Sequence, residues 1–214
     1  MSNDLSNYRK SYEKGELLIK DVPNTPIQLF QDWFDEVDTH FPDQETNAMS
    51  LSTIGLDGFP RNRIVLLKHY TENGFIFYTN YESKKGKAII NTPNVCLSFF
   101  WQEAERQVII KGIAEKIAED ISDTYFKSRP RGSKIGAHVS NQSQAVSKQE
   151  LENKLKQLEV FYKDKEIPRP KHWGGFLVKP IEIEFWQGRP NRLHDRISYK
   201  LDTDHRWNVT RLAP

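Results

Sequence analysis

Three side chains able to bind an anion or an electron-rich ring follow one another near the end of the sequence. Arg192, His194 and Arg196 are spaced by two residues, shortly after Trp186. Alternate residues of a β-strand point to one face, so this spacing predicts a row of two guanidinium groups and an imidazole. Cations that repel one another add nothing to a core. The row indicates either a binding site or a solvated strand face, and the spacing alone favours neither.

A hydrophobic run near the first third of the chain has a cation at each end. Arg63 and Lys68 bracket four apolar residues that are typical of a β-strand. Strict alternation places the two cations on opposite faces, so they share a ligand only if the strand contains a bulge. Cations at strand ends also extend into solvent along their aliphatic stems. Both interpretations stay open.

Two lysines stand at the expected start of a short helix, residues 83–90. Lys84 and Lys85 follow Ser83, shortly after Tyr78 and Thr79 at the end of a predicted strand. A helix N-terminus attracts anions, and lysines there oppose the helix dipole. The pair makes more sense beside a bound phosphate, with a solvated lysine pair as the alternative.

A phenol, a guanidinium and a hydroxyl recur with a spacing of four residues. Tyr125, Arg129 and Ser133 would share one face of a helix. Pro130 interrupts the helix between the last two, which limits that alignment. The alternative is a core tyrosine beside two surface residues. Together, the four groups contain enough donors for two phosphorylated ligands.

Composition narrows the class of protein. The 214 residues are 37% hydrophobic and 28% charged, with a net charge of +2 and no basic block. This pattern is typical of a soluble globular protein and lacks the electrostatic signature of a nucleic-acid binder. One cysteine, Cys96, and scattered histidines predict no metal site. With no apolar leader or membrane-length run, a cytoplasmic protein without membrane contact is expected.

The elements that would position these groups are mostly strands. Residues 1–24 read as a mobile arm, and helices are expected over 29–37, 83–90, 119–129 and 147–162. Strands are expected over 48–56, 63–70, 75–79, 95–101, 107–117, 176–186, 192–201 and 206–212. Hairpin-like connections predict an α+β protein, with residues 25–214 forming a single domain. Its expected core is an antiparallel barrel with helices packed outside, rather than a doubly wound parallel sheet.

Several motifs together resemble the pyridoxine (pyridoxamine) 5′-phosphate oxidases, a family of FMN enzymes of vitamin B6 metabolism. The resemblance covers residues 29–214. It rests on Arg-Ile-Val-Leu-Leu-Lys at 63–68, Phe-Tyr-Thr-Asn at 77–80, Glu-Arg-Gln-Val at 105–108, Tyr-Phe-Lys-Ser-Arg-Pro-Arg at 125–131, Phe-Trp-Gln-Gly at 185–188, Arg-Leu-His-Asp-Arg at 192–196 and the terminal Arg-Leu-Ala-Pro. The resemblance implies an FMN-binding split barrel that forms a homodimer, with FMN at the subunit interface.

The resemblance also implies roles for individual residues. It implies that FMN contacts Arg63, Lys68, Tyr78, Thr79, Lys84, Lys85, Gln107, Gln142, Ser143, Trp186 and Arg196. It implies that the substrate is held by Arg9, Tyr12, Lys68, Tyr125, Arg129, Ser133, Arg192 and His194, the last two being catalytic. Position 84 is often arginine in the family, and the lysine here keeps the charge without the bidentate geometry.

The implied reaction is the oxidation of pyridoxine or pyridoxamine 5′-phosphate to pyridoxal 5′-phosphate, with O2 as the electron acceptor. Two rival interpretations remain: a non-catalytic split-barrel protein that stores or senses FMN or pyridoxal phosphate, and a different flavin-dependent oxidoreductase. Arg192 and His194 disfavour the first, because a carrier needs only phosphate anchors. The set Tyr125, Arg129 and Ser133 disfavours the second.

Overall fold

The computed structural model describes residues 3–214, so the first two residues of the predicted arm lie outside the described residues. Its strands are β1 (Ala48–Ile54), β2 (Pro60–Thr71), β3 (Gly74–Asn80), β4 (Asn94–Trp101), β5 (Arg106–Lys116), β6 (Trp173–Gln187), β7 (Asp195–Leu201) and β8 (Trp207–Leu212). Its α-helices are α1 (Pro26–His40), α2 (Lys84–Asn91), α3 (Glu119–Ser128), α4 (Arg131–Val139) and α5 (Lys148–Phe161).

The strands form one sheet that closes on itself. Its order is β3-β2-β1-β4-β5-β6-β7-β8, and β3 also pairs antiparallel with β6. That second pairing turns six strands into a closed antiparallel barrel, which confirms the predicted barrel fold. β7 and β8 continue the sheet beyond β6.

Most of the predicted elements are confirmed, and two differ. The predicted strand 192–201 is wrong in its first three residues, because Pro190–Arg192 form a short 3-10 helix and β7 begins only at Asp195. Asn191 and Arg192 have φ values of 57° and 61°, in the left-handed region that no strand uses. Helix α4 was not predicted. It begins directly after Pro130, which is its N-cap residue, and the missing N–H of proline costs no helical hydrogen bond there.

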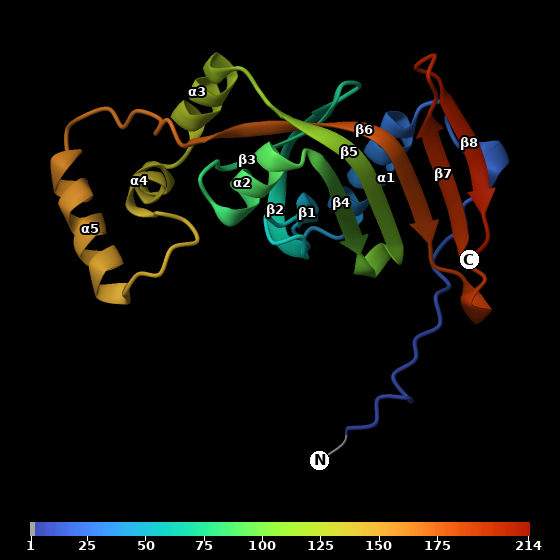
Figure 1. Ribbon diagram of the computed structural model, residues 1–214. Helices are drawn as coiled ribbons and strands as arrows, with labels where there is room; N and C mark the ends of the chain where they lie inside the picture. The colour runs from blue at the N-terminus through green and yellow to red at the C-terminus, as the bar shows by residue number, and fades with distance from the viewer. Residues whose placement is uncertain (1–2) are drawn as a thin grey trace. The chain divides into compact units, whose positions relative to one another are not determined.

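The chain divides into two compact units, and β1, β4, β5 and β6 each contribute to both. The second unit comprises Leu51–Cys96 and Gly112–Lys179. Figure 1 shows its helices α3, α4 and α5 gathered beside one another. Phe126, Ile135 and Trp173 are at the centre of their shared apolar cluster. The capping box of Ser147 and Glu150 is present at the start of α5, as predicted.

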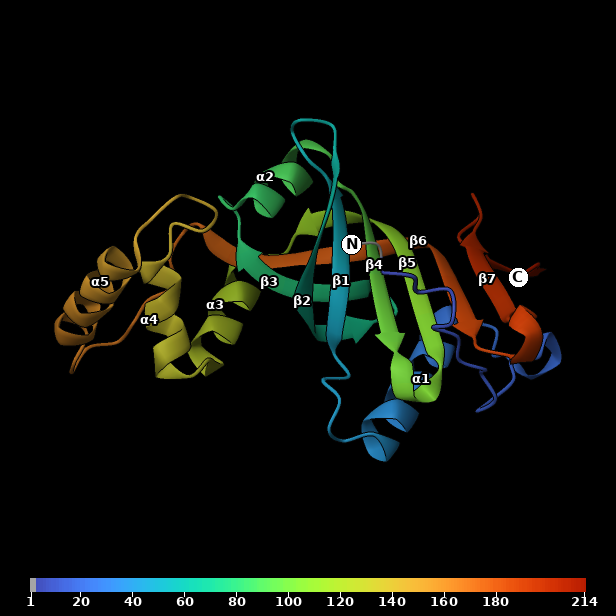
Figure 2. The same cartoon turned by 90° about the horizontal axis from the view of Figure 1, so that it is seen from below.

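The first unit comprises the residues up to Ser50, together with Leu97–Lys111 and Pro180–Pro214. Figure 2 shows α1 beside the turn that joins β4 to β5. On α1, Phe30 packs against Phe99 with ring centroids 5.2 Å apart, and Trp33 packs edge-on against Phe185 at 5.3 Å. These fully or almost fully buried rings form the core of the unit.

Over residues 3–214, none of the helices combines the length and the apolar character that crossing a bilayer requires.

Candidate functional site

The candidate site in the second unit begins with an irregularity in β2. Pairing with β3 shifts its register between Leu67 and His69, so Lys68 is the extra residue of a bulge. The bulge changes the direction of the Lys68 side chain from the one that strict alternation would give it. Sequence analysis named a bulge as the condition for Arg63 and Lys68 to share a ligand. The structure contains a bulge at Lys68.

The N-terminus of α2 forms one side of this region. Ser83 caps the helix, its Oγ accepting the Gly86 N–H at 3.2 Å. Lys84 donates its backbone N–H to Ser143 Oγ at 3.2 Å, and Lys85 Nζ donates to Gln142 Oε1 at 3.1 Å. The loop that carries Gln142 and Ser143 is therefore held against the helix start, as expected for residues that share a ligand.

The opposite side comes from α3 and α4. Helix α3 ends at Ser128 and α4 starts at Arg131, so Pro130 does interrupt the helical face of Tyr125, Arg129 and Ser133. All three nevertheless line the same pocket, because the two helices meet at that corner. The phenol of Tyr125 stacks on Tyr78 with ring centroids 3.9 Å apart.

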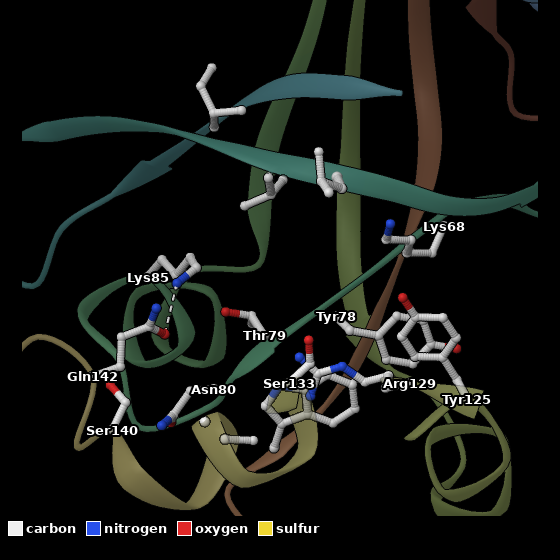
Figure 3. Close-up of a pocket in the computed structure, with 16 residues that line it drawn as sticks. Lys68, Tyr78, Thr79, Asn80, Lys85, Tyr125, Arg129, Ser133, Ser140 and Gln142 are labelled. Atoms are coloured by element: carbon white, nitrogen blue, oxygen red, sulfur yellow. Dashed lines mark hydrogen bonds between the residues drawn. The ribbon is translucent and has the colours of Figure 1, made fainter. Parts of the chain in front are cut away.

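Figure 3 shows these side chains around a pocket of about 510 Å³. Lys85 and Gln142 are at one end, and Lys68, Tyr125 and Arg129 are at the other. Eight of the residues that sequence analysis assigned to ligands line it: Lys68, Tyr78, Thr79, Lys85, Tyr125, Arg129, Ser133 and Gln142. A second pocket of about 380 Å³ shares Lys85 and Gln142 and adds Arg61, Asn62, Arg63, Lys84 and Ser143.

Arg129 has the donor chemistry that most clearly suits an anion. Its Nη1 is buried without a hydrogen-bond partner in the described part of the chain. The guanidinium carbon lies 4.5 Å from the ring centroid of Trp173, so the indole ring packs against the guanidinium group. Burial of the guanidinium lowers the pKa of Arg129 from its ordinary value, and Tyr125 has a smaller opposing effect. A buried donor left unpaired is costly, and a phosphate oxygen would satisfy it.

Lys85, at the other end of the pocket, is also a cation that burial desolvates. Its pKa falls to about 8, first because the ammonium is buried and second because Arg63 repels it. Arg63 is itself fixed, donating from Nη1 to Leu51 O at 3.0 Å and to Thr53 Oγ1 at 2.8 Å. Two cations brought together in this way fit a doubly charged group such as a phosphate ester.

The remaining predicted residues belong to the first unit, where β6 ends and β7 begins. Trp186 and His194 lie with ring centroids 4.7 Å apart, and Tyr12 meets both edge-on, at 5.6 and 5.9 Å. Arg192 is exposed on the 3-10 turn, so the predicted strand-face row of Arg192, His194 and Arg196 is wrong. The left-handed turn replaces the alternation on which that row depended.

His194 is held as a neutral imidazole. Its Nδ1 lies 3.1 Å from the backbone N of Arg189, whose N–H can only be donated to an unprotonated nitrogen. Burial lowers the pKa of His194, and the charge of Arg192 lowers it further, against a smaller opposing effect of Asp195. With Nδ1 occupied, Nε2 carries the proton and is a hydrogen-bond donor.

Three more predicted residues belong to the first unit, and one of them, Arg196, pairs with Trp186 across β6 and β7. Arg196 is engaged by Glu184 through two hydrogen bonds, Nε–Oε1 at 2.8 Å and Nη2–Oε2 at 3.0 Å, which raise its pKa. Gln107 lies on β5 within the first unit. Arg9 is exposed and donates from Nε to Ser6 O.

Several lining residues were missed by sequence reasoning. Trp173 stacks on Tyr78 with their planes 8° apart and supports Arg129. Asn80, Ser140 and Ala137 also line the larger pocket. A tryptophan directly before Gly174 and Gly175 was a usable signal, because adjacent glycines in a strand mark close approach of other groups.

The geometry can therefore hold two anionic groups in joined pockets between a stacked aromatic wall and the start of a helix. The donor chemistry fits FMN together with a second phosphorylated molecule. Arg63, Lys84, Lys85 and Ser143 suit the cofactor phosphate, while Lys68, Tyr125, Arg129 and Ser133 suit the second phosphate.

Comparison with known proteins points the same way. Residues 36–162 match the family model described as pyridoxamine 5′-phosphate oxidase. Residues 173–214 match the model described as the pyridoxine 5′-phosphate oxidase C-terminal dimerisation region. A Flavobacterium psychrophilum protein named pyridoxine/pyridoxamine 5′-phosphate oxidase is 64% identical over 212 residues, covering 99% of each chain. A Bordetella pertussis protein of the same name is 48% identical over 211 residues, covering 98% of this chain and 99% of its own.

A solved structure is similar over nearly the whole chain. The crystal structure of PhzG from Burkholderia lata 383, in complex with tetrahydrophenazine-1-carboxylic acid, superimposes with a TM-score of 0.86 at 28% identity. The match covers 94% of this chain and 100% of that one. A Nostoc punctiforme protein described as pyridoxamine 5′-phosphate oxidase-related and FMN-binding has a TM-score of 0.70 at 13% identity, which shows a shared fold.

Proposed function

The chain belongs to the pyridoxamine 5′-phosphate oxidase family, and from this premise we propose that it oxidises pyridoxine 5′-phosphate or pyridoxamine 5′-phosphate to pyridoxal 5′-phosphate. O2 is the final electron acceptor and leaves as H2O2. The amine substrate additionally consumes water and releases ammonia, which balances the atoms. The observation that carries the proposal is the buried, unpaired Nη1 of Arg129, beside Lys68, Tyr125 and Ser133.

The proposal gives these four residues the substrate phosphate. Arg129 supplies a flat guanidinium and Lys68 a compact ammonium, with the phenol and the hydroxyl as further donors. Holding one end of the substrate in this way fixes the position of the carbon to be oxidised. Fixed orientation contributes much of the rate in reactions where the cofactor performs the redox step.

FMN, when bound, supplies the group that accepts two electrons and a hydrogen from the substrate carbon. The proposal assigns its phosphate to Arg63, Lys84, Lys85 and Ser143. It assigns further FMN contacts to Tyr78, Thr79, Gln107, Gln142, Trp186 and Arg196, and Lys68 serves both ligands. The Lys85 pKa of about 8 supports the phosphate assignment, because a dianion relieves the repulsion from Arg63.

His194 and Arg192 are proposed as the residues that hold the pyridine ring. Neutral His194 presents Nε2–H as a donor, since its Nδ1 accepts the Arg189 N–H. Arg192 is exposed and free to reach a ligand, while Trp186 packs against the imidazole and limits its orientation. Arg9 and Tyr12 are proposed to cover the bound substrate.

The active form is proposed to be a homodimer with FMN at the subunit interface. The match of residues 173–214 to the dimerisation region of the family supports this assembly. In the proposed dimer, each FMN contacts residues of both copies.

Anaerobic reduction of the purified holoprotein tests the proposal. Mixing it with pyridoxamine 5′-phosphate is expected to bleach the yellow flavin absorbance, and admitting air is expected to restore it. Colour without bleaching would support a storage or sensing protein. Bleaching by other reductants but not by pyridoxamine 5′-phosphate would support a different flavin-dependent oxidoreductase.

A further inference from the structure

Residues 10–17, here called the strap, run across the first unit as an extended segment. The strap is fastened at its centre to Glu105. One carboxylate oxygen, Oε2, accepts the backbone N–H groups of Glu13 at 2.7 Å and Lys14 at 3.0 Å. The other oxygen, Oε1, lies 3.8 Å from Lys10 Nζ. In the described part of the chain, the partners of this carboxylate all belong to the strap.

Glu105 has no other evident reason to be buried. The residue is only 2% exposed, and a buried carboxylate is costly unless donors surround it. Its backbone has φ 56° and ψ 39°, a left-handed conformation that disfavours glutamate. The conformation is held by its own carbonyl, which accepts the N–H of Gly188 at 2.8 Å and Gln187 Nε2 at 3.2 Å.

A second carboxylate fastens the far end of the strap. Asp195 Oδ2 accepts the Leu17 N–H at 3.0 Å, and Leu17 is buried. Between the two carboxylates, Arg189 Nη1 donates to Gly15 O at 2.8 Å. Asp195 directly follows His194, so the strap is bonded to the residue next to the proposed substrate-binding histidine.

The fastened strap carries Tyr12 to the proposed ring-binding residues. Tyr12 lies edge-on to both Trp186 and His194, and its Cβ and Cγ occupy the space beside Gly188. A Cβ added at Gly188 would lie 2.7 Å from both atoms, so only glycine leaves room for the tyrosine. Glu105 holds the residue next to Tyr12 by its amide.

We propose that Glu105 is a positioning residue whose buried carboxylate grips the strap at the Glu13 and Lys14 amides and so keeps Tyr12 over His194. The consequence for catalysis rests on the proposed function. Without the grip, Tyr12 leaves the imidazole, and a bound substrate loses its cover. The grip itself is a property of the folded chain and is measurable whether or not the protein is an oxidase.

The test compares Glu105→Asn with Glu103→Gln in the full-length holoprotein. Asparagine suits the left-handed backbone but is too short to reach the strap amides. Glu103 lies in the same turn, and its side chain makes an exposed ion pair with Lys14, which makes its variant a matched control. Trypsin cleavage after Lys10 and Lys14, followed by mass spectrometry, reports release of the strap. Thermal midpoints report whether each variant is folded.

Glu105→Asn is expected to be cleaved about tenfold faster than the unchanged protein, since charge-assisted hydrogen bonds to two amides are lost. Its KM for pyridoxamine 5′-phosphate is expected to rise while FMN affinity stays the same. Gly188→Ala, which displaces Tyr12 and leaves Glu105 intact, is expected to raise KM in the same way. It provides the test if Glu105→Asn does not fold.

Unchanged cleavage in folded Glu105→Asn, or equal acceleration in Glu103→Gln, would overturn the proposal. So would a Gly188→Ala protein with an unaltered KM. Faster cleavage in a protein without oxidase activity would leave the grip standing and overturn the proposed function instead.

Discussion

At the scale of single residues, the site is explained by two pocket cations that burial desolvates, Arg129 and Lys85. Arg129 Nη1 is buried and unpaired, and Lys85 is buried beside Arg63. Each arrangement lowers the stability of the protein in the absence of ligand, because a buried charge needs compensation. A protein retains such groups where an anionic ligand supplies the compensation. We therefore expect that removing Arg129 or Lys85 weakens ligand binding without lowering the stability of the fold.

Arg129→Met is expected to raise KM for the phosphorylated substrate by about 10- to 100-fold, the value of one or two charge-assisted hydrogen bonds. The thermal midpoint is expected to stay level or rise, because an unpaired buried cation is removed. Arg131→Met is the control, since its guanidinium bonds to the end of α5 at Tyr162 O and Lys163 O. It should lose stability and keep KM. A destabilised Arg129→Met with normal KM would contradict this interpretation.

Lys85 predicts a pH dependence of FMN binding. Its pKa in the ligand-free protein is about 8, and a bound phosphate raises it, so binding takes up a proton above that pH. FMN affinity is expected to be level just below pH 8 and to fall as the pH rises above it. The stability of the apoprotein changes with the opposite sign and rises between about pH 8 and 10.5, the ordinary pKa of lysine, because the unfolded chain binds the proton more tightly.

Fluorescence titration of the apoprotein with FMN at a series of pH values measures the effect. Lys85→Met is expected to bind more weakly and to lose the pH dependence over the same range. An unchanged pH profile in that variant would show that another group is responsible.

At the scale of elements, the site depends on where strands and helices begin, end and bulge. The bulge at Lys68 and the cap at Ser83 bring cations from β2 and α2 to joined pockets. Sequence analysis predicted a helix start at Ser83, and it named a bulge as the condition for Arg63 and Lys68 to share one ligand. Helix periodicity and the capping box at Ser147 were sufficient to predict α5.

Other elements were beyond local pattern. Pro130 follows the end of α3 and is also the N-cap residue of α4, and the sequence analysis used it only as a helix stop, so α4 was missed. The 3-10 turn before β7 depends on left-handed Asn191 and Arg192, and only the asparagine is a usual residue there. Arg192, His194 and Arg196 keep a spacing of two residues, but the first two precede β7, so the predicted strand face does not exist.

The helix caps supply a matched pair of variants. Ser83→Ala and Ser147→Ala each remove a hydrogen bond to a helix N-terminus, and each is expected to lower the free energy of unfolding by about 1 kcal/mol. Only Ser83→Ala is expected to weaken FMN binding, because α2 carries Lys84 and Lys85. Calorimetry and FMN titration measure the two effects. Equal FMN affinity in both variants would show that α2 does not contribute to FMN binding.

The whole molecule closes its barrel through a pairing far apart in sequence. β3 pairs with β6 over residues 75–80 and 173–178, and no local pattern announces which strands close a barrel. Sequence analysis predicted a barrel from the strand pattern and from the family resemblance, but not which strands close it. The division into two compact units likewise depends on long-range packing, because β1, β4, β5 and β6 each contribute to both.

The proposed homodimer predicts that assembly and cofactor binding are coupled. Light scattering is expected to give twice the mass of one chain. Dilution into the range where dimers dissociate is expected to release FMN, because ligand binding stabilises the assembled form by mass action. A monomer that retains FMN at the same affinity would contradict the interface site.

The phosphate dependence of product formation tests the central claim most directly. The holoprotein is supplied with pyridoxamine 5′-phosphate or with unphosphorylated pyridoxamine, and the aldehyde product and H2O2 are both measured in air. The account predicts stoichiometric aldehyde and H2O2 from the phosphorylated amine. It also predicts a kcat/KM at least about 100-fold lower without the phosphate, since Arg129 and Lys68 then lose their partner. Equal rates with both amines, or no aldehyde from either, would contradict it.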